Sequence, residues 1–225
     1  MTDDAVKTGE RIVEGLRFYA VMAGVFLLVA IIGFGPNSID ILNGTKTNPP
    51  LLIHIHAASM TAWLLLLLAQ AGFVSAGRQT LHQALGKLVL IVAPVVLVLM
   101  VMIVLKDYQD DALPLYAALI QGKRIIVFSL GVGLAVLWRR KYPEAHKRLM
   151  FLATFAVLDA AFFRMGWFLP GFGFEHPFAI GHAWQLVLLV PFLVYDLSTR
   201  GRIHPVFLIG VPVIIAVQTT AALIY

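Results

Sequence analysis

The chain has 225 residues, of which 60% are hydrophobic and only 13% are charged, and it contains no cysteine. A water-soluble domain carries about a quarter charged residues, so this composition excludes an ordinary soluble globule and indicates that lipid is the main solvent. The lack of cysteine excludes disulfides, thiolate metal sites and cysteine nucleophiles. The net charge of +5 does not indicate a nucleic-acid partner, because the basic residues lie in short segments between apolar runs.

The apolar runs are long enough to cross a bilayer, for which about 20 residues are needed. In chain order they fall at about 16–35, 51–75, 84–105, 120–139, 148–169, 178–197 and 204–223. The first run ends without a small-residue cleavage site, so we expect a retained helix and not a signal peptide. Prolines between the runs predict breaks, at Pro36, Pro49, Pro50, Pro114, Pro143 and Pro177. Prolines inside the runs predict kinks, at Pro94, Pro191 and Pro212.

The basic residues divide unequally between the two predicted sides of the membrane. One side carries Lys7, Arg11, Arg17, Arg78, Lys87, Arg139, Arg140, Lys141, Lys147, Arg148, Arg200 and Arg202, and the other carries Lys46, Lys106, Lys123 and Arg124. Short cytoplasmic segments are rich in Lys and Arg, so the first side is predicted to be cytoplasmic. The sequence therefore predicts an all-α integral membrane protein with seven transmembrane helices, a cytoplasmic N-terminus and a C-terminus outside.

We expect residues 1–225 to form a single bundle, in which the first helix is followed by hairpins at 51–105, 120–169 and 178–223. Two of the inner turns have a similar pattern, with Gly77-Arg78 before His82 and Gly201-Arg202 before His204. A parallel duplication of the hairpin explains this similarity. The general preference of inner turns for basic residues explains it as well, and the sequence leaves both explanations open.

The histidines divide by their predicted depth in the membrane. His54, His56 and His182 fall near the outer face, whereas the inner-face histidines are His82, His146 and His204. Imidazoles from distant helices can ligate a divalent metal, or haem b through its two axial positions. His56 and His182 are the first candidates for either cofactor, followed by His54. Two residues advance about 200° on a helix, so His54 and His56 can share one centre only if the helix start is unwound.

Asp159 lies within a predicted span, where an ionisable side chain costs about 2.5–3.5 kcal/mol and normally faces a cavity or a partner. It completes the predicted metal ligands, and further polar residues are predicted at a similar depth: Arg124, Arg164, Gln185 and Gln218. The alternative is a buried pair of Asp159 with Arg124 or Arg164 that only holds helices together. Asp159 and Arg164 are five residues apart, so an intrahelical pair would have imperfect geometry.

Several short motifs occur in a recognisable order. They are His56 with Met60 and Trp63, then Gly77-Arg78 with Leu81-His82 and Leu85-Gly86, and then His146-Lys147-Arg148-Leu149-Met150. In these motifs, over roughly residues 50–210, the chain resembles a group of uncharacterised, histidine-containing bacterial multi-pass membrane proteins. The resemblance implies a bacterial inner membrane and no established activity.

Three functional hypotheses follow from the sequence. The first is a haem- or metal-binding protein that serves redox chemistry or cofactor handling at the outer face. The second is a small proton-coupled transporter that uses Asp159. The third is a non-catalytic accessory subunit of a larger membrane complex, or a homo-oligomer, with structural histidines.

Overall fold

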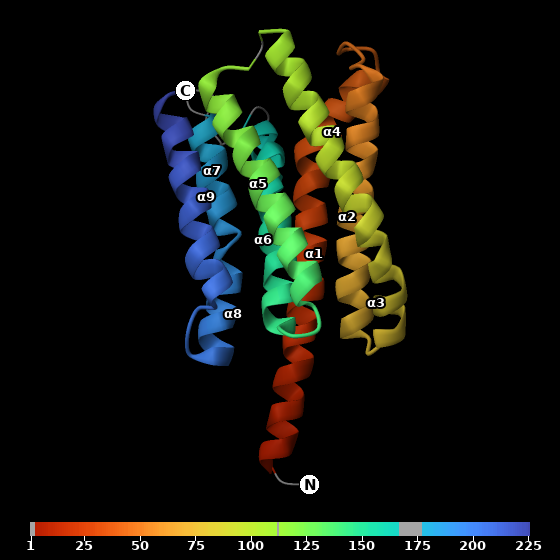
Figure 1. The fold of residues 1–225 in the computed structure, drawn as a ribbon, viewed down its shortest axis with the longest axis vertical. Helices are drawn as coiled ribbons and strands as arrows, with labels where there is room; N and C mark the ends of the chain where they lie inside the picture. Colours follow the sequence, from red (N-terminus) through yellow and green to blue (C-terminus); the bar gives the residue numbers. More distant parts are fainter. Residues whose placement is uncertain (1–2, 112, 167–176) are drawn as a thin grey trace.

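The computed structural model describes residues 3–111, 113–166 and 177–225, and those residues form helices, turns and short connections without a strand. The helices run along the long axis of a bundle (Figure 1). They are α1 (Asp3–Leu42), α2 (Leu51–Ser75), α3 (Gln79–Leu85), η1 (Gly86–Leu88), α4 (Val89–Gln109), α5 (Leu115–Trp138), α6 (Pro143–Met165), α7 (Pro177–Val187), α8 (Val190–Arg200) and α9 (Pro205–Leu223).

Among the described residues, six helical segments are long and apolar enough to cross a membrane, which supports a multi-pass, all-α membrane protein. They are Arg17–Leu42, Leu51–Ser75, Gln79–Gln109, Leu115–Trp138, Ala179–Arg200 and Pro205–Leu223. The predicted span at 148–169 corresponds to α6, which is not among them. The last residues of that predicted span lie outside the described residues.

The prediction that Pro36 ends the first helix is wrong, because α1 continues through it to Leu42. Membrane helices tolerate an interior proline when neighbouring groups satisfy the freed carbonyl. The predicted kinks at Pro94 and Pro212 both lie inside helices, in α4 and α9. The predicted run at 178–197 is divided into α7 and α8, and Pro191 lies in the first turn of α8. The other predicted breaks are confirmed, because Pro50 and Pro114 are the N-caps of α2 and α5, and Pro143 and Pro177 begin α6 and α7.

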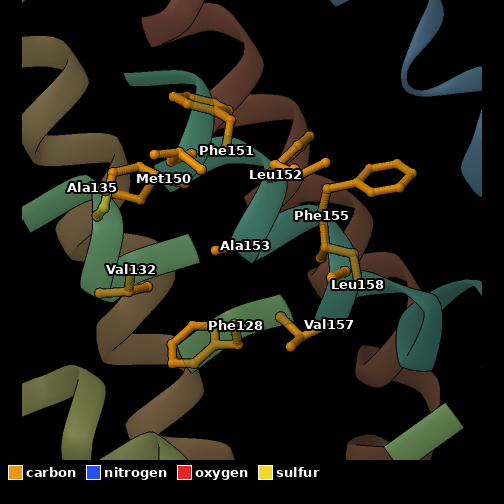
Figure 2. Close-up of a cluster of buried hydrophobic side chains, with 14 of the residues drawn as sticks. Phe128, Val132, Ala135, Met150, Phe151, Leu152, Ala153, Phe155, Val157 and Leu158 are labelled. Carbon is orange, nitrogen blue, oxygen red and sulfur yellow. The ribbon is translucent and has the colours of Figure 1, made fainter. Parts of the chain in front are cut away.

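The helix α6 lies at the centre of the bundle, where it contacts α1, α5, α7 and α9. Its apolar side chains are buried along most of its length, and Figure 2 shows Ala153 and Val157 of α6 near Phe128 and Val132 of α5. Protein neighbours replace lipid around this helix. That position explains how α6 tolerates more polar residues than the helices that surround it.

Glycines allow the surrounding helices to approach α6 closely. A Cβ atom at Gly33 of α1 would lie 2.6 Å from the carbonyl oxygen of Ala161, and one at Gly131 of α5 would lie 2.8 Å from the Cβ of Ala153. Small residues let the backbones of membrane helices pack tightly in this way. At Gly133 of α5, in contrast, a Cβ atom would meet nothing within 4 Å.

The two ends of the bundle can be told apart in Figure 1. The C-terminus and the connection between α1 and α2 lie at the upper end, and the N-terminus, α3 and the turn between α8 and α9 lie at the lower end. Gly77 and Gly201 take positive φ angles of 71° and 67° in two of the lower turns, a conformation that glycine adopts without steric cost.

Candidate functional site

A buried ion-pair centre joins α5 to α6 in the upper half of the bundle. The Asp159 side chain has no exposed surface, and its two carboxylate oxygens accept from two different cations. Lys123 Nζ lies 2.5 Å from Asp159 Oδ2, and Arg124 Nε lies 2.7 Å from Asp159 Oδ1. The Lys123 side chain is also fully buried, whereas Arg124 keeps 18% of its side chain exposed. Asp159 therefore has a charged partner on each oxygen.

The positions of these residues along their helices place the centre well inside the bundle. Lys123 lies eight residues after Leu115, the first residue of α5, which is about 12 Å along the helix axis. Asp159 lies six residues before Met165, the last residue of α6, which is about 9 Å. The predicted span at 120–139 placed Lys123 and Arg124 in its first turn, near the outer face, whereas α5 begins at Leu115 and both residues lie further inside.

Two further interactions bring a second guanidinium group to this end of α6. Arg124 Nη1 donates to Gln121 Oε1 at 2.8 Å. Arg164 Nη1 donates to the carbonyl oxygen of Ala160 at 2.9 Å, and its guanidinium carbon lies 4.5 Å from the ring centroid of Phe34. Arg164 is within electrostatic range of Arg124 and Asp159 but makes no ion pair with Asp159. The five-residue spacing was expected to give imperfect geometry for an intrahelical Asp159–Arg164 pair, and the lack of an ion pair between these two residues agrees with that expectation. We call Lys123, Arg124, Asp159 and Arg164 the upper charged site.

Two of the three predicted cofactor histidines border the upper charged site. His182 of α7 is buried within electrostatic range of Asp159 and Lys123. His56 of α2 lies within electrostatic range of Arg124 and Arg164. His54, in contrast, is exposed, and its Nε2 atom pairs with Asn48 Oδ1 at 2.8 Å. The start of α2 is regularly helical at these residues, so His54 and His56 diverge as two positions on a helix must.

The described residues contain no group of three or more His, Cys, Asp or Glu side chains that could hold a metal ion. The metal site predicted from His54, His56, His182 and Asp159 is therefore unsupported. The physical reasons are the outward direction of His54 and the occupation of both Asp159 oxygens by Lys123 and Arg124. Among the described residues, His56 and His182 remain as a two-histidine form of the cofactor hypothesis.

The predicted polar residues Gln185 and Gln218 form a chain between helices. Gln218 Nε2 of α9 donates to Gln185 Oε1 of α7 at 2.6 Å, and Gln185 Nε2 donates to the carbonyl oxygen of Phe155 in α6 at 2.6 Å. Both glutamines are buried. Nearer the middle of α6, Trp63 Nε1 donates to Thr154 Oγ1 at 3.0 Å. These bonds connect α2, α7 and α9 to the central helix in a setting where water cannot compete.

The three inner-face histidines lie at the lower end, and two of them are neighbours. The rings of His82 and His146 have centroids 6.5 Å apart. His146 Nδ1 pairs with the carbonyl oxygen of Ala135 at 2.8 Å, and the side-chain amide of Gln70 reaches His82 Nδ1 at 2.7 Å. His204 stands apart as the N-cap of α9, where its Nδ1 accepts from the backbone N–H of Val206. Each of these histidines has a structural partner.

A second buried ion pair, which the sequence analysis did not predict, lies in the lower half. The side chains of Arg148 in α6 and Asp196 in α8 are both fully buried. Arg148 Nε donates to Asp196 Oδ1 at 2.9 Å, Nη2 reaches the same oxygen, and Nη1 lies 2.6 Å from Glu144 Oε2. Asp196 Oδ2 also accepts from the backbone N–H of His204 at 2.9 Å. We call Glu144, Arg148 and Asp196 the lower charged site. Asp196 falls inside the predicted span at 178–197, so the argument that identified Asp159 applied to it equally.

No family model, curated protein or solved structure matches this chain.

Proposed function

We propose that the protein is a seven-span protein of the bacterial inner membrane, with the N-terminus in the cytoplasm and the C-terminus outside. The surplus of Lys and Arg over the lower connections supports this orientation. Burial of α6 among apolar helices supports its role as the seventh span, because its polar residues face protein and not lipid. In this orientation the upper charged site lies towards the outer face.

The orientation can be tested with single cysteines, because the natural chain has none. A membrane-impermeant maleimide added to intact spheroplasts should label K46C, in the connection after α1, and should leave K141C unlabelled until the membrane is opened. The reverse pattern would overturn the orientation. Labelling of both variants in intact, sealed cells would overturn the seven-span arrangement. That result would place both connections on the outer side, whereas the arrangement places them on opposite sides.

We propose further that the upper charged site is the functional centre of a small proton-coupled transporter. The observation that carries this proposal is the fully buried Lys123–Asp159 pair, which lies about 9–12 Å inside the bundle. Charges at membrane depth are expensive, and they commonly mark substrate pathways and proton relays. A pair of opposite charges can separate when a proton or a ligand takes the place of one partner.

Two histidines beside the pair support a role for protons. His182 lies within electrostatic range of Asp159, and His56 lies within electrostatic range of Arg124 and Arg164. A histidine ring has one nitrogen that can donate a proton and one that can accept a proton, so each ring can pass protons to or from the site. Asp159 would couple proton movement to ligand binding through the competition between a proton and the cations for its oxygens.

Transport can be measured in vesicles that contain the purified protein and a pH-sensitive dye. A membrane potential that is negative inside the vesicles is imposed. Candidate solutes (organic acids, phosphate, amino acids and sugars) are then added one at a time. We expect one class to drive proton entry with the natural protein and not with D159N. The matched control is D110N, because Asp110 pairs with Lys106 at the exposed upper end of α4 and carries the same charge. Equal proton entry with D159N and the natural protein would contradict the proposal.

Binding of haem b is the second candidate function, favoured by His56 and His182, which both lie within electrostatic range of Arg124. Two histidines from facing helices can supply both axial ligands of a haem iron. The purified protein should then show a Soret absorption band that H56Q and H182Q each remove, whereas H54Q leaves it unchanged. A protein without this band and without stoichiometric metal would remove the cofactor hypothesis.

An accessory role in a larger membrane complex is the third candidate, favoured by an apolar groove of about 370 Å³ between α4 and α5. Its lining includes Pro94, Ser129 and Gly133. Membrane helices associate through such small residues. Purification from the native membrane in a mild detergent tests this role, since a subunit should elute with stoichiometric partners, and a chain that elutes alone should not be assigned to a complex.

A further inference from the structure

The upper charged site holds more positive than negative charge. Lys123, Arg124 and Arg164 contribute three cations, and Asp159 is the single carboxylate among them, which leaves an excess of two positive charges. We propose that this site binds an oxyanion, a carboxylate or a phosphate group, through Arg124 and Arg164. This inference rests on the proposed role of the site as a ligand centre and names the chemical class of that ligand.

The excess charge requires a partner because of where it lies. Arg124 and Arg164 carry the excess charge, and both side chains are partly withdrawn from solvent, where a cation is less stable than in water unless an anion balances it. Asp159 is already shared between Lys123 and Arg124. Arg164 makes no ion pair within the part of the chain that the structure describes, and its printed contacts are one carbonyl oxygen and the face of Phe34. An anionic ligand would balance the site.

The guanidinium groups have the hydrogen-bond donors that such a ligand needs. Each guanidinium carries N–H donors on three nitrogens. Arg124 uses Nε for Asp159 and Nη1 for Gln121, and its Nη2 has no acceptor among the described residues. Arg164 uses Nη1 alone, for the carbonyl oxygen of Ala160. The remaining N–H groups match the paired oxygens of a carboxylate or phosphate, which arginine binds in a bidentate manner.

An unpaired ring nitrogen lies near the same two guanidinium groups. The Nδ1 atom of His56 is buried and has no hydrogen-bond partner among the described residues. His56 lies within electrostatic range of both Arg124 and Arg164. A buried polar atom without a partner is unfavourable, so this nitrogen has a reason to bind a ligand that the two guanidinium groups hold. The ligand position is thus bordered by α2, α5 and α6, with Phe34 of α1 behind Arg164.

The oxyanion can come from two sources, which share the same recognition chemistry. One source is a water-soluble acid that enters from the upper end, and the other is the phosphate of an anionic lipid. Arg124 is partly exposed, which is compatible with either route. The test therefore includes probes of both kinds.

Binding is measured on the full-length protein, purified in a neutral detergent and free of added lipid, by thermal shift and calorimetry. The soluble probes are succinate and inorganic phosphate, and the lipid probe is phosphatidylglycerol with phosphatidylcholine as the uncharged comparison. We expect saturable binding of at least one anionic probe, weakened at least ten-fold in R164Q and in R124Q. Binding of succinate or phosphate identifies a soluble ligand, and selective binding of phosphatidylglycerol identifies a lipid headgroup.

The matched control is R140Q, which removes one exposed arginine at the other end of the bundle. It should bind the probe as tightly as the natural protein. R164K keeps the charge without the guanidinium geometry and should retain part of the affinity lost in R164Q. The proposal is overturned if no anionic probe binds, or if R164Q and R124Q bind as tightly as R140Q.

D159N separates this inference from the proposed transport function. Removing the carboxylate frees Lys123 and Arg124, so anion binding should become tighter by about ten-fold, whereas proton coupling should be lost. Arginine-dependent anion binding without any proton movement in vesicles would refute transport and leave the anion site established. Weaker anion binding in folded D159N would contradict the idea that Asp159 competes with the ligand for the same cations.

Discussion

The two charged sites lie towards opposite ends of the same helix, and they differ in the way their charges are balanced. In the lower site, buried Arg148 is matched by buried Asp196, and Glu144 takes the remaining N–H groups. In the upper site, a single buried carboxylate faces three cations. Both sites contain fully buried charges, so burial alone does not distinguish them.

The difference indicates two separate roles. A buried carboxylate that accepts from a guanidinium group and from a backbone N–H has the properties of a structural connection, here between α6 and α8. A buried site with excess charge and donors without acceptors is energetically incomplete until something binds. Both sites contain arginine and aspartate, so residue type does not distinguish an interhelical connection from a ligand site. Counting the charges and the hydrogen-bond partners does distinguish them.

The largest expected effect comes from breaking the balanced pair. R148M leaves Asp196 buried beside an apolar side chain, which should destabilise the protein by about 3–5 kcal/mol. R164M removes an unmatched cation from the upper site and should leave the stability without ligand unchanged or higher. Thermal unfolding in the same detergent compares the two variants. A loss in R164M as large as that in R148M would show that the upper site is structural as well.

A smaller effect is expected from separating α1 from α6 near the upper site. G33A places a Cβ atom 2.6 Å from the carbonyl oxygen of Ala161, and the forced shift should cost about 1–3 kcal/mol. The same change at Gly133, where a Cβ atom meets nothing within 4 Å, should be neutral or slightly stabilising. Because Phe34 and Arg164 lie next to this contact, G33A should also weaken anion binding. An unchanged anion affinity in G33A would show that α1 does not position Arg164 for binding.

A hydrogen bond between uncharged side chains, Trp63 and Thr154, lies between the upper and lower charged sites. It provides a reference for the stability that an interhelical contact contributes without an ion pair. T154V removes the hydroxyl that accepts from Trp63 Nε1 and leaves that N–H buried without a partner. The expected loss of stability is about 1 kcal/mol, and T154S, which keeps the hydroxyl, should show much less. Anion binding should not change in either variant. A larger loss in T154V than in R148M would mean that ion pairing is not the main connection of α6 to its neighbours.

The smallest effect concerns His204, which lies between α8 and α9 at the lower site. Burial, together with the nearby Arg148 and Arg200, lowers the pKa of His204 below its ordinary value of 6.5. The unfolded chain then takes up the proton at a higher pH than the folded one, so stability should fall as the pH drops below about 6.5. H204N keeps a capping side chain without a titrating group and should flatten this fall. An identical pH profile for both proteins would show that His204 does not contribute.

The sequence supported the membrane class and the approximate helix positions, because both depend on local hydrophobicity. Runs of about 20 apolar residues predict membrane helices whatever surrounds them. The same argument identified Asp159 as a buried charge, and it would have identified Asp196 within the run at 178–197 had it been applied there. Lys123 was missed for a different reason: α5 begins at Leu115, five residues before the predicted start, so a lysine expected at the outer end of the span lies eight residues into the helix and is buried.

Only the tertiary structure decided which polar residues meet. Asp159 and Arg164 lie five positions apart on α6, yet they do not pair. The partners of Asp159 are Lys123 and Arg124, which come from α5. Likewise, His56 borders the upper charged site whereas His54, two residues earlier, does not. Hydrophobicity fixes that a segment is helical and buried in lipid, but the rotation of each helix depends on close contacts such as that of Gly33 with Ala161. Those contacts join residues far apart in the chain, and no local pattern contains them.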